Sequence, residues 1–141
     1  MDQEKEAHMH ALLAEPVLAR LATTNPETLQ PHVVPVWFLW DGSTIWISAF
    51  VSTRKVRDLM KNLRCAVLVE PKLPADGLQA VLLEGQAELI SEPASLIAEM
   101  SARIYTKYLG PEGVLAAEPQ SWIHDPENRL VKLTPARRMA W

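Results

Sequence analysis

The clearest chemical signal in the sequence is a group of cations at the start of a predicted helix. Residues 48–63 read SAFVSTRKVRDLMKNL, in which a strand-like run passes into an amphipathic helix predicted over 53–63. Ser52 or Thr53 is a suitable N-cap. The turn that follows is basic and contains Arg54, Lys55 and Arg57. Each exposed cation there opposes the helix dipole at a cost of about 0.3–1 kcal/mol. A bound phosphate would reverse that cost, so the pattern favours an anion site, with a solvated turn as the alternative.

The other side chains that could take part in catalysis or metal binding do not form a recognisable motif in the sequence. The sequence has no GxGxxG, GxxxxGK[ST] or GxSxG motif. Its four histidines are unpaired, and the lone Cys65 lies in an apolar run typical of a small buried hydrophobe. Without a CxxC or HExxH motif we predict no metal site. No side chain demands a general acid or base role, so we name no catalytic residue.

Composition restricts the class of protein. A chain of 141 residues with a net charge of −3 fits one domain, residues 1–141, and gives no reason to expect nucleic acid as a partner. The longest apolar run, residues 33–40, is too short to span a bilayer, so we expect no membrane partner. The polar, acidic N-terminus and the single cysteine favour a cytoplasmic protein.

The elements that must position the anion site are mostly strands. Apolar or alternating runs predict six strands, at 17–24, 32–40, 44–50, 64–70, 78–90 and 129–135. Periodicity and stop signals predict two or three helices, at 3–14, 53–63 and 91–111. The remaining segments are predicted as a turn at 25–31, a loop at 71–77, an irregular stretch at 111–128 and a tail at 136–141.

The order of these elements favours a mainly β, α+β fold: a six-stranded antiparallel barrel with flanking helices. Asp41-Gly42 between two apolar runs is a strong hairpin signal, and Gly85 within a long strand indicates a bulge or bend. The strand at 32–40 is apolar on both faces and must be covered on both sides. Pro35 within it indicates an edge or a bulge. The apolar face of the helix at 53–63 consists of Val56, Leu59, Met60 and Leu63.

The first half of the chain resembles the pyridoxamine 5′-phosphate oxidase-related split β-barrel flavoproteins. The similarity lies in an order of pieces: a strand, PVWF, an Asp-Gly hairpin, a strand, [ST]RK, a helix ending near Asn-Leu, and a strand. LLEGQAELI and the closing LTPARRMAW also match, so the resemblance spans nearly the whole chain.

This resemblance implies a homodimer that binds FMN, or the deazaflavin coenzyme F-420, at its interface. It implies that Arg54 and Lys55 hold the cofactor phosphate with help from Thr53, and that Trp141 lies near the cofactor of the partner subunit. The residues implied to line the ring are Val34, Pro35, Val36, Ser48, Ala49 and Phe50. The cofactor then performs hydride chemistry on a small organic substrate.

Two points separate this chain from its relatives. The basic C-terminal segment with which true pyridoxamine phosphate oxidases bind substrate is not matched, so we expect an activity other than vitamin B6 oxidation. Coenzyme F-420 also needs a groove for its acidic tail, for which Arg57, Lys61 and Arg64 are candidates unless they form a solvated helix face. The alternatives from other classes are a non-catalytic cofactor or tetrapyrrole carrier and a nucleic-acid-binding barrel, the latter disfavoured by the acidic charge balance.

Overall fold

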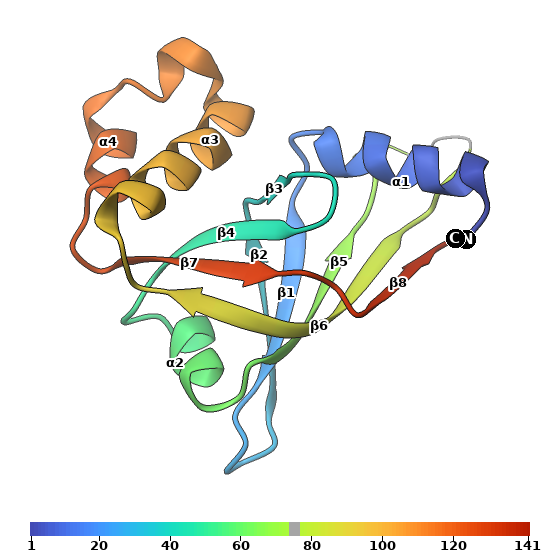
Figure 1. Ribbon diagram of the computed structural model, residues 1–141, viewed down its shortest axis with the longest axis horizontal. Coiled ribbons are helices and arrows are strands. Elements are labelled where there is room, and N and C mark those ends of the chain that lie inside the picture. Colours follow the sequence, from blue (N-terminus) through green and yellow to red (C-terminus); the bar gives the residue numbers. More distant parts are fainter. Residues whose placement is uncertain (74–76) are drawn as a thin grey trace.

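The computed structural model describes residues 1–73 and 77–141 as an antiparallel sheet curled into a half-barrel, with helices packed around it (Figure 1). The strands are β1 Ala19–Thr24, β2 Pro31–Val36, β3 Leu39–Trp40, β4 Ile45–Phe50, β5 Arg64–Val69, β6 Val81–Ile90, β7 Asn128–Leu133 and β8 Arg137–Ala140. The helices are α1 Gln3–Ala14, α2 Arg54–Lys61, α3 Ala94–Gly113 and α4 Ala117–Ile123. The strand order is β2-β1-β5-β6-β7-β4-β3, and β8 pairs with β6.

The predicted mainly β, α+β class is confirmed, but the element counts were wrong. The described residues form eight strands rather than six, and four helices rather than two or three. The predicted tail became β8, because its backbone pairs with β6 from Val81↔Ala140 to Glu84↔Arg137. The predicted irregular stretch contains α4, which packs against α3. Of the predicted loop at 71–77, residues 74–76 lie outside the described residues.

The single strand predicted at 32–40 is interrupted. Strand β2 ends at Val36, and the next ladder residue is Leu39 in β3. Between them the N–H of the buried Phe38 donates to the Tyr108 hydroxyl of α3 at 3.2 Å, instead of to a neighbouring strand. The edge position predicted from Pro35 is confirmed, because β2 pairs only with β1 and ends the strand order.

Gly85 marks the bend that allows one long strand to serve both halves of the sheet. The first part of β6 pairs with β5, and its last part, from Ala87 to Ile90, pairs with β7. A Cβ atom on Gly85 would lie 3.1 Å from the backbone nitrogen of Ala136, in the β7–β8 connection. A side chain here would crowd the backbone of the β7–β8 connection, and this close approach fits the predicted bend.

Two groups of buried side chains hold the half-barrel and its helices together. The larger group fills the curled sheet and includes Phe38, and Leu59 of α2 belongs to it. The smaller group joins α3 to β4 and β7 and consists of Trp46, Ile97, Met100, Ile104 and Leu130. These contacts hold α2 and α3 in place on the sheet. A site formed between these helices and the sheet would therefore be preformed. Among the described residues, no helix has the length and apolar character needed to cross a membrane.

Candidate functional site

A cleft of about 310 Å³ opens between the edge strand β2, strand β4 and helices α2 and α3. Its walls are mainly apolar and aromatic, with one cation and two hydroxyl groups. The lining residues are Leu18, Pro35, Val36, Trp37, Ser48, Lys55, Ile104 and Tyr105. A concave apolar site with few polar groups is the usual form of a small-molecule or cofactor site.

Lys55 supplies the positive charge of this cleft from the first turn of α2. Its side chain is half-buried, and burial lowers the pKa of the ammonium group below its ordinary value. Thr53 occupies the N-cap position, as predicted, but its hydroxyl donates to the Phe50 carbonyl at 2.7 Å rather than capping the helix. The first turn of α2 itself contains no acidic residue.

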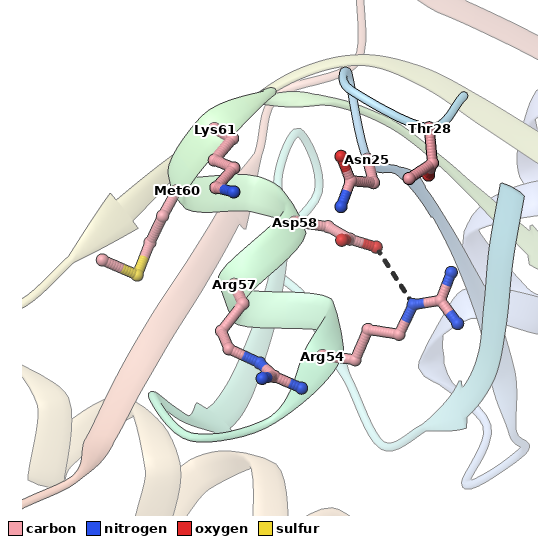
Figure 2. Close-up of a pocket in the computed structure, with 7 residues that line it drawn as sticks. All are labelled: Asn25, Thr28, Arg54, Arg57, Asp58, Met60 and Lys61. Carbon is pink, nitrogen blue, oxygen red and sulfur yellow. Dashed lines mark ion pairs between the residues drawn. The ribbon is translucent and has the colours of Figure 1, made fainter. Parts of the chain in front are cut away.

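Arg54 lines a different cavity, a basic groove of about 650 Å³ between α2 and the β1–β2 connection (Figure 2). We call this cavity the basic groove; its residues are Asn25, Thr28, Arg54, Arg57, Asp58, Met60 and Lys61. Nε of Arg54 lies 3.7 Å from Oδ2 of Asp58. That carboxylate oxygen also accepts a 2.9 Å hydrogen bond from the Thr23 hydroxyl.

The face that α2 buries differs from the predicted one. Val56 and Leu59 are buried as expected, whereas Met60 is 64% exposed and Leu63 follows the helix as an exposed residue. Asp58, which the apolar pattern did not single out, is only 4% exposed. Its hydrogen bond from Thr23 on β1 compensates the burial of a charged group, and this contact is not visible in local periodicity.

The opposite wall of the cleft contains a chain of hydrogen bonds. The Tyr105 hydroxyl donates to Ser48 Oγ at 3.3 Å, and Ser48 donates to Oδ1 of Asn128 at 2.7 Å. Burial raises the pKa of Tyr105, so this phenol stays protonated at neutral pH. The Trp37 ring meets Tyr105 edge-on at 5.8 Å and stacks on Tyr108 at 4.7 Å. This wall is therefore rigid and aromatic.

Comparison with known proteins places this architecture in a family. Residues 6–141 match the model of the family described as pyridoxamine 5′-phosphate oxidase. The chain belongs to the pyridoxamine 5′-phosphate oxidase family. The resemblance inferred from the sequence is thereby confirmed. Among curated proteins, none matches the sequence.

Solved structures share the fold of this family member at low sequence identity. An F420 reductase has 22% identity and a TM-score of 0.73, with 92% of this chain and 94% of that chain covered. A conserved hypothetical protein from Mycobacterium tuberculosis has 23% identity and a TM-score of 0.77, with 100% and 84% covered. General stress protein 26 from Bacillus anthracis has 18% identity and a TM-score of 0.69, with 96% and 92% covered.

The structure of this family member brings together only part of the predicted site. Four of the ten predicted residues line the cleft: Pro35, Val36, Ser48 and Lys55. Two others contribute to the hydrophobic core, Val34 and Ala49. Phe50 is the last residue of β4 and Thr53 immediately precedes α2, so the two stand at either end of the connection that leads to the cations. The alternation of side chains along β4 explains why Ser48 lines the cleft while its neighbour Ala49 lies in the core. Strand β2 ends at Val36, and the consecutive residues Pro35, Val36 and Trp37 all line the cleft.

Arg54 and Trp141 lie apart from the cleft within one chain. Arg54 faces the basic groove. Trp141 lies at the far end of the sheet, where its backbone N–H donates to the Ala80 carbonyl at 3.1 Å (Figure 1). Its side chain is 49% exposed. A role for Trp141 at a cofactor thus requires a second copy of the chain.

The cleft residues that sequence reasoning missed are Leu18, Trp37 and Tyr105. It also did not foresee the contacts of Lys107, which does not line the cleft. The i, i+4 pattern of α3 identified Ile104 and Tyr108, and Tyr105 lies next to that face. Nζ of Lys107 donates to the carbonyls of Leu13 at 3.0 Å and Phe38 at 3.2 Å. Burial lowers the pKa of Lys107 to about 8. Only the tertiary fold shows these contacts, since the partners lie far apart in the chain.

Proposed function

We propose that the protein is a homodimeric oxidoreductase that binds FMN, with coenzyme F-420 as the alternative cofactor, and that it reduces or oxidises a small organic substrate. The cleft beside α2 carries this proposal, because apolar and aromatic walls there meet one half-buried cation, Lys55. A flavin combines a flat, largely apolar ring with a phosphate. The donor set of the cleft therefore fits such a molecule.

Different residues of the chain bind the phosphate and the ring of the cofactor. Lys55 and Arg54 hold the phosphate at the first turn of α2, where the backbone N–H groups of a helix start add to the attraction. Pro35 and Val36 pack against the ring, and Trp37 excludes water from one side. The bound cofactor supplies the hydride chemistry, while the protein binds, orients and shields it.

The exposed surface of β2 supports a dimer. Val33 is 63% exposed and Pro35 is exposed, although β2 is an edge strand with a free backbone. An apolar edge left uncovered favours association with other chains. A second copy would cover this edge and bring its own Trp141 towards the cleft. Size-exclusion chromatography with light scattering tests this part of the proposal, and a monomer at micromolar concentration would contradict it.

The basic groove supports F-420 as the alternative cofactor. Three cations, Arg54, Arg57 and Lys61, line it beside the carboxylate of Asp58. Lys61 also pairs with Glu27 of the β1–β2 connection at 2.9 Å, so the groove keeps a smaller net positive charge. An acidic tail such as that of F-420 suits this charge, whereas FMN has no such tail. Arg64, also predicted for the tail, is not among the groove residues. Of the residues predicted to bind the acidic tail, those that remain candidates are therefore Arg57 and Lys61 of α2.

The experiment is a visible absorption scan of the purified protein, followed by separate titrations with FMN and F-420. A bound flavin spectrum or saturable FMN binding supports the first cofactor, and preferential F-420 binding supports the second. Turnover is then measured by mixing the reduced complex with a quinone acceptor. Binding without turnover would favour the non-catalytic carrier, and failure to bind either cofactor would overturn the proposal.

A further inference from the structure

The cleft contains a hydrogen-bond chain whose direction is fixed at its buried end. Asn128 is only 2% exposed, and its Nδ2 donates to the Ile123 carbonyl at 3.1 Å and to Ser101 Oγ at 2.9 Å. A backbone carbonyl can only accept, so the amide NH₂ must face Ile123. The amide oxygen of Asn128 must then face Ser48.

This orientation sets the direction of every hydrogen bond up to the cleft. Ser48 has one hydroxyl hydrogen, which it donates to Asn128 Oδ1 at 2.7 Å. Towards Tyr105, Ser48 therefore presents only lone pairs. The Tyr105 hydroxyl donates its single hydrogen to Ser48 at 3.3 Å. The lone pairs of the Tyr105 oxygen remain available to a ligand.

The Tyr105 ring cannot easily turn away from this arrangement. It packs edge-on against Trp37 at 5.8 Å and in a tilted arrangement against Trp122 at 5.5 Å. Tyr105 and Ser48 both line the cleft, together with Lys55. The cleft therefore has two polar components of opposite kind: a cation on α2, and an oxygen acceptor between α3 and β4.

We infer that Tyr105 is a specificity-determining residue that accepts a hydrogen bond from an N–H or O–H group of the bound ring. A ligand carbonyl at this position would have to draw the hydrogen of Tyr105 away from Ser48, so it would gain one hydrogen bond only by breaking another. The inference rests on the proposed function. The oxidised ring systems of FMN and F-420 both carry an N–H group on their pyrimidine edge, and this group is the donor that we assign to Tyr105.

The test compares FMN with 3-methyl-FMN, in which a methyl group replaces that hydrogen. Binding to the full-length protein is followed by quenching of tryptophan fluorescence. The wild-type protein is expected to prefer FMN. Loss of one net hydrogen bond of about 1 kcal/mol corresponds to about fivefold, so Tyr105→Phe should weaken FMN binding by about that factor and reduce the preference. If F-420 is the ligand that binds, Tyr105→Phe should weaken it by a similar factor.

Two further variants separate this role from a structural one. Ser48→Ala frees the hydrogen of Tyr105 and should also reduce the preference, with the aromatic wall intact. Thr44→Val is the control, because the buried Thr44 hydroxyl is hydrogen-bonded to the Thr134 hydroxyl at 2.9 Å and Thr44 does not line the cleft. It should lower the unfolding temperature without changing the preference for FMN.

The possible failures are distinct. Unchanged FMN affinity and preference in Tyr105→Phe would overturn the role of Tyr105 while leaving the proposed function in place. An equal loss of FMN and 3-methyl-FMN affinity would show a packing role only, and would also overturn it. Absence of FMN and F-420 binding to the wild-type protein would overturn both proposals.

Discussion

Arg54 and Lys55 are neighbours in the chain, and their side chains line two different cavities. Arg54 faces the basic groove beside the β1–β2 connection, and Lys55 faces the cleft formed with β2, β4 and α3. Successive residues of an α-helix project about 100° apart, so the first turn of α2 stands between the two cavities. A ligand held by both cations must therefore lie across the N-terminus of α2.

The first prediction concerns the carboxylate that orients Arg54. Asp58→Ala should lower the free energy of unfolding by about 1–3 kcal/mol, because the buried Thr23 hydroxyl loses its acceptor. Urea denaturation measures this change. Glu27→Ala is the control, because Glu27 and its ion-pair partner Lys61 are both exposed, and its effect should stay within about 1 kcal/mol. Equal effects of the two substitutions would contradict the supporting role of Asp58.

The second prediction concerns the pH dependence of stability. Burial lowers the pKa of Lys107 to about 8 in the folded protein, from an ordinary value of 10.5. Between these values the unfolded chain binds more protons than the folded one, so the contribution of Lys107 makes the free energy of unfolding rise with pH. Lys107→Met should flatten this rise. Denaturation curves from about pH 8 to about pH 10 measure it, and parallel pH profiles for both proteins would contradict the assignment.

The third prediction concerns Trp141. Trp141→Ala should weaken cofactor binding by at least about fivefold, because aromatic stacking contributes about 1 kcal/mol in addition to the area that the ring buries. The backbone of Trp141 remains bound to Ala80 by two hydrogen bonds of 3.1 Å, so the fold should not change. Isothermal titration calorimetry measures the affinity. A loss as large as that caused by removing Arg54 and Lys55 would show that Trp141 is a principal binding residue, contrary to this account.

Local sequence signals were sufficient to predict α1, most of the strands and the basic first turn of α2. Helix α1 has the predicted bounds of 3–14, and Gly85 lies at the predicted bend. These features depend on periodicity and on the special conformations of glycine and proline, which act over a few residues. The family resemblance depended likewise on the order of short pieces.

Features created by distant partners could not be predicted in the same way. The break between β2 and β3 depends on Tyr108, which lies 70 residues beyond Phe38 in the chain. Strand β8 has a charged sequence, Arg137–Ala140, and forms because β6 offers a free edge. The position of Tyr105 beside Ser48 depends on how α3 packs on β4. Each of these three features depends on a contact between residues that come together only in the folded chain.

The most direct test of the central claim is cofactor titration of the wild-type protein beside the double variant Arg54→Ala/Lys55→Ala. Arg20→Ala/Lys72→Ala is the matched control, since it removes two cations that line a different pocket. We predict that the wild-type and control proteins bind FMN or F-420 and that Arg54→Ala/Lys55→Ala does not, although its thermal unfolding remains cooperative. Unchanged affinity in Arg54→Ala/Lys55→Ala would contradict the account and place the cofactor away from α2.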